Sequence, residues 1–193
     1  MRLFQKIAEF YNKRGLSFFN KGDQERAIGY FDHAIELDPG YVEAYYNRGL
    51  AYAVKGDPNR AIRDFDQAIQ LNPSFASAYN NRGGVYFNKG DLDRAIRDFD
   101  QAIQFNPGFA SAYNNRGRVY ARKGDSESAI SDFNQAIYLD PKFDATYLNR
   151  GLYFAGKGEK ENAIADFEKF LELCSITTLR QDARNELEKL GVK

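Results

Sequence analysis

The nine residues FASAYNNRG occupy positions 75–83 and occur again, unchanged, at positions 109–117. A second stretch, RAIRDFDQAIQ, occurs at 60–70 and at 94–104. In both cases the second copy begins 34 residues after the first. A fixed period of this length indicates a chain built from copies of one supersecondary unit. The repeat, rather than any single segment, therefore decides the fold.

Four of the five prolines continue the same period and lie near the ends of the first four units. These prolines are Pro39, Pro73, Pro107 and Pro141. Counting with the period gives five units, which span residues 8–41, 42–75, 76–109, 110–143 and 144–177. We therefore expect one repeat domain that covers residues 1–193.

Each unit is predicted to begin with a helix. An aromatic residue is followed four positions later by glycine and three positions after that by a second aromatic residue, as in Tyr79, Gly83 and Tyr86. Steps of four and three place these residues on one helical face. A KGD or KGE segment follows. Its lysine suits the last turn of a helix, its glycine suits the left-handed end of a helix, and its acidic residue can cap the next helix.

The second half of each unit predicts another helix, with Ala-Ile, then Phe, then Ala-Ile, as in 61–62, 65 and 68–69. Pro58 suits the first turn of this helix in the second unit. An Asp-Pro or Asn-Pro pair ends the helix in the first four units, because the residue before a proline avoids the helical region.

A pair of helices with these residues at these positions resembles the tetratricopeptide repeat. The resemblance covers residues 8–177, and seven marked positions recur in register. The fifth unit departs from the pattern, with Phe170 in place of an alanine and Ser175 in place of the proline. The resemblance implies an all-α fold, a right-handed superhelical solenoid of five helix pairs. Residues from about 178 to 190 resemble the helix that covers the last unit of such a solenoid.

Stacking explains why the same residues recur. A single helix pair cannot bury both of its faces, whereas stacked identical pairs can. We expect Gly83 and Gly117 to permit a close approach of helices, and Tyr79 and Tyr113 to fill the space that remains. The two asparagines and the arginine in the same stretch are not explained by the core.

An arginine recurs at the seventh position of every unit, where the family often has leucine. These residues are Arg14, Arg48, Arg82, Arg116 and Arg150. An unpaired charge beside the core is costly, and the second helices of the later units offer Asp64, Asp98, Asp132 and Asp166. We therefore predict internal Arg–Asp pairs with a structural role. The first unit has Tyr30 at the aspartate position, so Arg14 lacks a partner if pairing occurs within a unit, and Arg48 lacks one if pairing occurs with the preceding unit.

The resemblance also implies a ligand-binding surface. In the family the first helices line a concave groove, and the second, fifth, sixth, ninth, twelfth and thirteenth positions face the ligand. The sixth position here carries Asn47, Asn81, Asn115 and Asn149. An asparagine side chain offers one acceptor and two donor hydrogens, so it can hold the backbone of an extended peptide. The alternative is that these are solvated asparagines retained by duplication of the repeat.

Variable side chains at the other groove positions are the candidates for specificity. The candidates are Tyr46, Leu50, Asn80, Phe87, Asn114, Arg118 and Arg122. With Glu9 and Glu43, they make the predicted groove apolar and acidic at one end and basic toward the other. Arg118 and Arg122 are four residues apart, so they face the same way and can bind a carboxylate or a phosphate. The alternative is an exposed, solvated pair.

Composition excludes several other classes of protein. Lys plus Arg and Asp plus Glu each number 27, so the formal net charge is zero and gives no general attraction to nucleic acid or anionic lipid. We expect neither as a partner. The single cysteine, Cys174, cannot form an intrachain disulfide and favours a reducing compartment. The sequence contains no apolar run typical of a signal peptide or membrane span, so we expect a soluble, cytoplasmic protein.

We expect no catalytic activity, metal or cofactor. His33 is the only histidine, and the next three units carry glutamine at its position (Gln67, Gln101 and Gln135), which indicates an exposed polar site. Cys174 follows an apolar run and is predicted to be buried. The glycines are explained by the repeat and form no phosphate loop or dinucleotide fingerprint.

The leading functional prediction is a protein–protein interaction scaffold that binds an extended peptide or a helix of a partner in its groove. The alternatives are a self-associating structural module and an accessory regulatory subunit of an enzyme. The first helix begins early and carries Phe4, Ile7 and Phe10, where the later units have small residues at the position of Phe10. An apolar end face of this kind predicts a weak homodimer through these three residues, unless they only close the first repeat.

Overall fold

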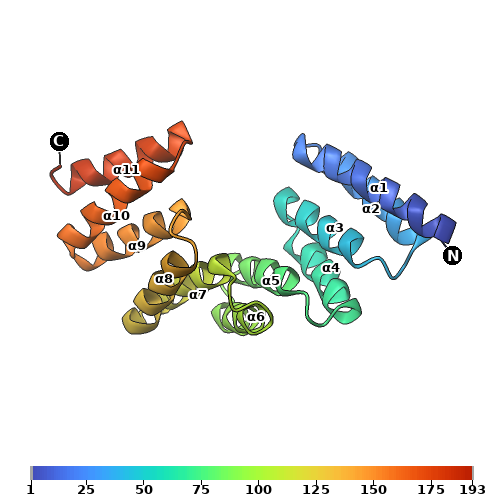
Figure 1. Ribbon diagram of the computed structural model, residues 1–193, viewed down its shortest axis with the longest axis horizontal. Coiled ribbons are helices and arrows are strands. Elements are labelled where there is room, and N and C mark those ends of the chain that lie inside the picture. The colour runs from blue at the N-terminus through green and yellow to red at the C-terminus, as the bar shows by residue number, and fades with distance from the viewer. Residues whose placement is uncertain (1, 193) are drawn as a thin grey trace. The chain divides into compact units, whose positions relative to one another are not determined.

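The computed structural model describes residues 2–192, and this part of the chain consists of eleven helices and no strands (Figure 1). The first helices of the repeats are α1 (Arg2–Asn20), α3 (Val42–Lys55), α5 (Ala76–Asn88), α7 (Ala110–Lys123) and α9 (Asp144–Lys157). The second helices are α2 (Gln24–Leu37), α4 (Pro58–Leu71), α6 (Leu92–Phe105), α8 (Ser126–Leu139) and α10 (Lys160–Leu173). A last helix, α11 (Thr177–Lys189), follows. The all-α prediction is confirmed, and α3, α5, α7 and α9 begin at the predicted boundaries.

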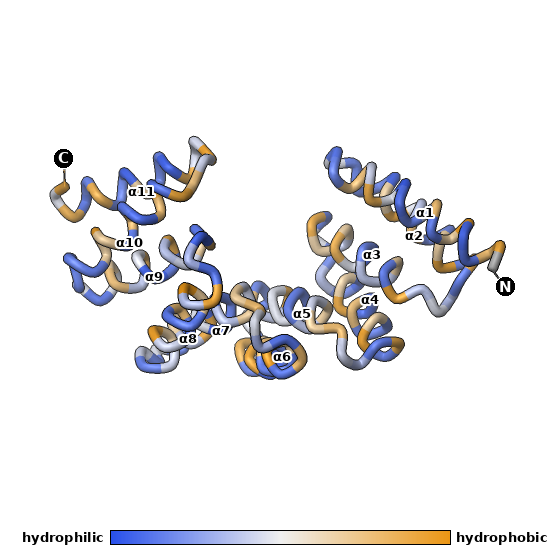
Figure 2. The backbone as a smooth tube through the Cα atoms, in the orientation of Figure 1, coloured by the Kyte–Doolittle hydropathy of each residue, from blue (hydrophilic) through white to orange (hydrophobic). Residues whose placement is uncertain are grey.

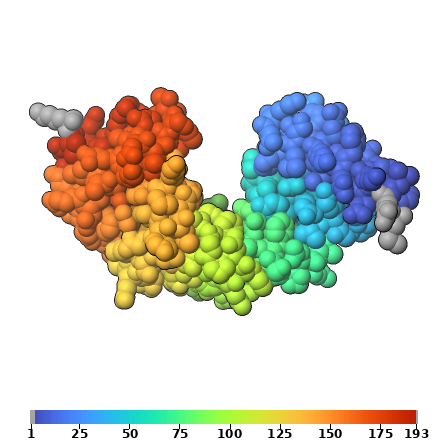
Figure 3. Space-filling view, viewed as in Figure 1, coloured from blue at the N-terminus to red at the C-terminus, as the bar shows by residue number. Residues whose placement is uncertain are grey.

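The helices form two compact units, Met1–Asn106 with α1 to α6 and Pro107–Lys193 with α7 to α11. Below, these are called unit 1 and unit 2, and each is described by itself. Within each unit the two helices of a repeat pack against each other, and the second helix also contacts the first helix of the next repeat. The space-filling view shows this packing between the first two repeats, in blue and cyan (Figure 3).

The KGD segments turn the chain between helices as predicted. In the third repeat Gly90 has a φ of +81°, a left-handed conformation that glycine adopts without strain. Asp91 then caps α6, because its Oδ1 accepts a hydrogen bond from the backbone N–H of Arg94 at 3.1 Å. In the fifth repeat the predicted acidic cap is wrong: Glu159 makes no side-chain cap and instead accepts from Asn162. Its longer side chain is not among those that suit an N-cap.

One phenylalanine per repeat forms the centre of the core. Phe31, Phe65, Phe99, Phe133 and Phe167 are each at most 1% exposed. The ring of Phe99 lies against the backbone of Gly83, where a Cβ atom would be 2.9 Å from Cε1. The predicted close approach at Gly83 is therefore confirmed, and Gly117 has the same relation to Phe133. Figure 2 shows how apolar and polar residues alternate along the helices.

The fifth repeat departs from the pattern because α11 covers it. Phe170 is 1% exposed and packs with Cys174 and with Ala183 of α11. Ala183 is fully buried. A small residue on α11 leaves room for the larger side chain of Phe170. The prediction of a buried Cys174 is confirmed. Arg180 of α11 donates hydrogen bonds to the backbone carbonyls of Leu171 and Cys174, which satisfies acceptors at the end of α10.

Candidate functional site

The candidate binding face consists of the six groove positions on the first helix of each repeat. In unit 1 its predicted site residues are Tyr46, Asn47, Leu50, Asn80, Asn81 and Phe87, and in unit 2 they are Asn114, Asn115, Arg118, Arg122 and Asn149. All of them lie on α3, α5, α7 or α9. Their side chains differ in exposure and in the hydrogen bonds that they form, and this decides what each can do.

The asparagines at the sixth position connect successive repeats. The Nδ2 of Asn81 donates to the hydroxyl of Tyr46 at 2.8 Å and to the backbone carbonyl of Ser77 at 2.9 Å. In the repeat before, the Nδ2 of Asn47 donates to the Oδ1 of Asn12 at 3.0 Å. Both contacts join the sixth position of one repeat to the fifth position of the preceding one. These asparagines are therefore held by neighbouring side chains, which neither expectation from the sequence foresaw.

Unit 2 contains the same arrangement. The Nδ2 of Asn149 donates to the Oδ1 of Asn114 at 2.9 Å. Asn114 is only 3% exposed, and Asn47 and Asn80 are each 8% exposed. These three asparagines offer little surface to a ligand, because the fifth and sixth positions meet at the junction of two repeats. Asn115 is half-buried.

Asn81 keeps one polar atom available. Its two amide hydrogens are donated to Tyr46 and Ser77, which fixes the orientation of the amide group. Its Oδ1 accepts no hydrogen bond within residues 2–192 and is not enclosed. A carbonyl oxygen held in this way can accept a hydrogen bond from the backbone N–H of a peptide.

The Tyr46 side chain beside Asn81 is held in place by aromatic packing. Its ring lies 4.9 Å from that of Phe75 and 6.0 Å from that of Phe65, measured between centroids. Burial raises the pKa of the Tyr46 hydroxyl, and the hydrogen bond from Asn81 acts in the opposite direction. The hydroxyl therefore stays protonated at neutral pH. Leu50 of α3 and Phe87 of α5 are half-buried, so this part of the face is largely apolar.

Gly84 is a residue of the candidate binding face that the sequence prediction missed. It occupies the ninth position of its repeat, where three other repeats have Leu16, Leu50 and Leu152. A Cβ atom built on Gly84 would meet no atom of the described residues within 4 Å beyond its chain neighbours and the backbone of its own helix. The neighbouring Gly83 is packed against Phe99, so two adjacent glycines have opposite surroundings. The absence of leucine at this position was the available signal.

Carboxylates lie at the end of the face near α1. The Nδ2 of Asn12 donates to the hydroxyl of Tyr41 at 3.3 Å. Burial raises the pKa of Tyr41, this hydrogen bond lowers it, and the charges of Glu43 and Glu9 raise it further. Glu43 is exposed and forms no ion pair within the described residues. In unit 2, Arg118 and Arg122 are both exposed on α7.

The recurring arginines pair within their own repeats, as one of the two predicted arrangements required. Arg82 donates through Nε and Nη2 to both carboxylate oxygens of Asp98, at 2.8 and 2.7 Å. Its Nη1 also donates to Asp66 of the preceding repeat at 2.5 Å, a second partner that the sequence prediction missed. Arg48, Arg116 and Arg150 repeat the pair with their own aspartates.

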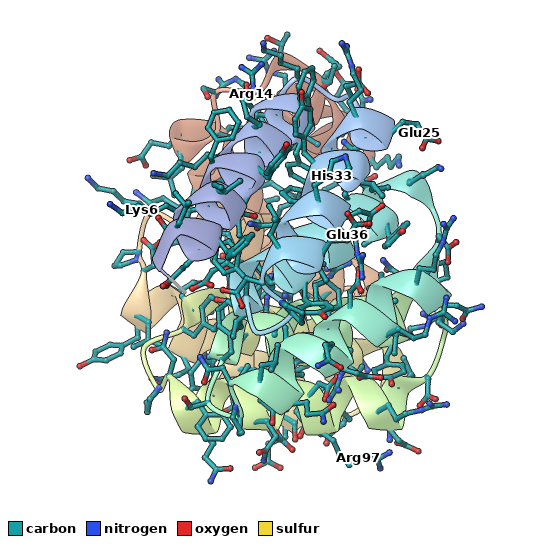
Figure 4. The ribbon with its side chains drawn as sticks, turned by 90° about the vertical axis from the view of Figure 1, so that its right-hand side faces the viewer. Lys6, Arg14, Glu25, His33, Glu36 and Arg97 are labelled. Carbon is teal, nitrogen blue, oxygen red and sulfur yellow. The ribbon has the colours of Figure 1, made fainter. Side chains whose placement is uncertain are left out.

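Arg14 is the exception that intra-repeat pairing predicts. It is exposed on α1 (Figure 4) and forms no ion pair within residues 2–192. Tyr30, which stands in place of the aspartate, instead stacks on Phe18 with the ring centroids 5.2 Å apart.

The structure contains no feature typical of a metal site in the part that it describes. Within residues 2–192, no three His, Cys, Asp or Glu side chains are grouped so that they could bind a metal ion. His33 is exposed and contacts Glu36 on the same helix (Figure 4). None of the helices formed by these residues has the length and apolar character needed to cross a bilayer.

Comparison with known families gives matches along most of the chain. Models described as tetratricopeptide repeat match residues 46–108, 110–143 and 145–176, and a model described as TPR repeat matches residues 15–56. An uncharacterized protein of Methanocaldococcus jannaschii is 54% identical over 39 residues. That alignment covers 20% of this chain and 45% of the length of the curated relative.

Solved structures with the same helical architecture include the crystal structure of MamA, which is 32% identical with a TM-score of 0.69. The match covers 82% of this chain and 92% of that chain. YrrB, described as a TPR protein with an unusual peptide-binding site, is 24% identical with a TM-score of 0.65, covering 91% of this chain and 90% of that one. PilF of Pseudomonas aeruginosa is 18% identical with a TM-score of 0.82, covering 97% and 90%. The last two show a likeness of fold alone.

Proposed function

The chain belongs to the tetratricopeptide repeat family, and on this premise we propose that it is a protein–protein interaction scaffold that binds an extended peptide segment of a partner. The observation that carries the proposal is the geometry of Asn81, whose amide hydrogens are fixed by Tyr46 and Ser77 while its Oδ1 stays available. An acceptor that is oriented before binding loses little conformational freedom when a peptide N–H reaches it. The half-buried apolar side chains of Leu50 and Phe87 lie on the same face.

Asn81→Ala is expected to weaken peptide binding by about 0.5–1.5 kcal/mol, the net contribution of one hydrogen bond. It is also expected to lower stability by a similar amount, because the contact with Tyr46 between repeats is lost. Random dodecapeptides displayed on phage are first selected on the immobilised full chain. The affinity of a selected peptide is then measured by fluorescence anisotropy.

Tyr46→Phe is the matched control for this experiment. It removes the hydroxyl that Asn81 contacts at 2.8 Å but keeps the Oδ1 of Asn81, whose amide is still held by the backbone carbonyl of Ser77. We expect a similar loss of stability and a much smaller loss of affinity. If Asn81→Ala and Tyr46→Phe bind the selected peptide with the same affinity, Asn81 has a structural role only. If no peptide is enriched over the bare support, the proposed function is wrong.

A second candidate function is self-association through the start of α1, and a specific observation favours it. Leu3, Phe4 and Phe10 are 68%, 57% and 58% exposed, which is unusual for large apolar side chains grouped on one helix. We expect a weak dimer at high concentration by light scattering, and we expect Phe4→Ser combined with Phe10→Ser to abolish it. Because both side chains are exposed, helicity by circular dichroism should not change. A wild-type chain that is monomeric at every concentration would contradict this function.

A further inference from the structure

We propose that the open space over Gly84 receives a large apolar side chain of the bound peptide, and that a lysine or arginine about four or five residues away on that peptide lies against Glu43. This inference rests on the proposed function and adds the chemistry of the partner. It concerns unit 1 alone, and it is carried by Gly84, by the side chains around it and by the free carboxylate of Glu43.

The first argument is the glycine itself. Apart from its two chain neighbours and the nearby backbone of α5 itself, no atom of residues 2–192 lies within 4 Å of the position that a Cβ atom of Gly84 would occupy. The same position is leucine in three other repeats, at Leu16, Leu50 and Leu152, so the fold accommodates a large side chain there. Glycine in the interior of a helix weakens that helix. Packing therefore gives no reason for glycine at this position, whereas space for a ligand side chain does.

The surroundings of Gly84 define which side chain fits. The hydrogen bond between Asn81 and Tyr46 shows that α5 and α3 lie alongside each other in this register. One turn further along both helices, Gly84 of α5 lies level with Leu50 of α3, which packs on the apolar cluster that includes Val85. One turn beyond Gly84 is the half-buried Phe87. A leucine, methionine or phenylalanine of a ligand would therefore meet the apolar side chains of Leu50 and Phe87 on two sides, with the asparagines of α5 one turn away beside them.

The Oδ1 of Asn81 stands one turn before Gly84 on the same side of α5. A peptide whose backbone N–H reaches this oxygen can thus place a neighbouring side chain over Gly84. The hydrogen bond and the apolar contact belong to one mode of binding, in which the backbone contact positions the chain and the side chain supplies selectivity.

Charge complementarity is the reason to expect a basic residue in the ligand. Glu43 is exposed at the start of α3 and has no ion-pair partner within residues 2–192. Glu9, on the neighbouring helix, also forms no ion pair with any described residue, although Lys13 lies one turn from it. One carboxylate oxygen of Asp38 accepts a hydrogen bond from the backbone N–H of Gly40. A cationic side chain is therefore favoured at Glu43.

The spacing follows from helix geometry. Glu43 precedes Leu50 by seven residues, which is about 10 Å along the helix axis. The step from one packed helix to the next is about 8–10 Å. The distance from Glu43 to the space over Gly84 is thus about 13–15 Å, which an extended peptide spans in about four or five residues.

The test uses phage-displayed random dodecapeptides selected on the full chain. Peptides enriched on the wild type are expected to carry a large apolar residue with lysine or arginine about four or five positions away. Filling the space with Gly84→Leu should reduce the affinity of such a peptide about tenfold or more. Gly84→Ala, which adds one methyl group, should cause a smaller loss and serves as a second variant if the leucine variant does not fold. Both variants should melt at or above the wild-type temperature, so lower affinity cannot come from loss of structure.

Glu43→Gln should reduce the affinity of the same peptide about threefold to tenfold at low salt, and less at high salt. The reduction should vanish when the basic residue of the peptide is replaced by alanine. If Gly84→Leu binds with wild-type affinity while Asn81→Ala binds weakly, the peptide lies on this face but not at Gly84, and only this inference is overturned. If no peptide is enriched on the wild type, the proposed function fails as well.

Discussion

Replacing Arg82 by alanine is expected to lower the free energy of unfolding by about 3–5 kcal/mol, because the change leaves a buried carboxylate without its partner. Asp98 is 5% exposed, and both of its oxygens accept hydrogen bonds from Arg82. Burial acts to lower the pKa of Arg82, but the hydrogen bonds and charges of Asp98 and Asp66 outweigh it and raise the pKa. The arginine is therefore cationic at neutral pH.

Arg14→Ala is the matched control, because Arg14 occupies the same position in the first repeat but is exposed and forms no ion pair within the described residues. It should change stability by less than about 0.5 kcal/mol. Urea denaturation followed by circular dichroism measures both effects. Equal effects of the two substitutions would show that the arginine contributes through its aliphatic part and not through its buried pair.

A double substitution separates the effect of the two charges from the effect of the volume that the side chains fill. Arg82→Leu combined with Asp98→Ala removes both charges together, and replacement of a buried ion pair by apolar residues is often close to neutral. We therefore expect the double variant to be more stable than Arg82→Ala alone. A double variant that is less stable than Arg82→Ala would contradict the explanation by an unpaired carboxylate, whereas a double variant far less stable than the wild type would indicate a net contribution from the ion pair itself.

The second large effect is expected at two adjacent glycines. Gly83→Ala should lower stability by about 1–3 kcal/mol, because its new Cβ atom would lie 2.9 Å from a carbon of the buried Phe99 ring and the packed core must shift. Gly84→Ala should raise stability by about 0.5–1 kcal/mol, because the new methyl group meets no other part of the described chain within 4 Å beyond its own helix and alanine favours the helix.

The decisive measurement is the sign of the change in stability that each glycine substitution causes. Both substitutions add the same methyl group to the same helix, so helix propensity contributes equally and only the surroundings differ. Thermal and urea denaturation of the two variants should give shifts in opposite directions. Shifts of the same sign would mean that α5 can rotate or that Phe99 can move away at little cost.

The helix pairs and the turns between them could be predicted from the sequence alone. The period of 34 residues, the KGD segments and the prolines act through local backbone preferences, which do not depend on the rest of the fold. They located the starts of α3 and α5 to the residue. The predicted Arg–Asp pairs were confirmed for a related reason, since each joins residues 16 apart on the two helices of one repeat.

The contacts between polar side chains of different repeats could not be predicted from the sequence. Asn81 reaches Tyr46, 35 residues away, and Arg82 reaches Asp66 of the preceding repeat. These contacts depend on how neighbouring helix pairs stack, which local preferences do not specify. The same holds for the pair Gly83 and Gly84: the letters are identical, but one glycine lies under the ring of Phe99 and the other faces open space. A helix turns by about 100° from one residue to the next, so adjacent glycines face different surroundings, and those surroundings exist only once the repeats are stacked.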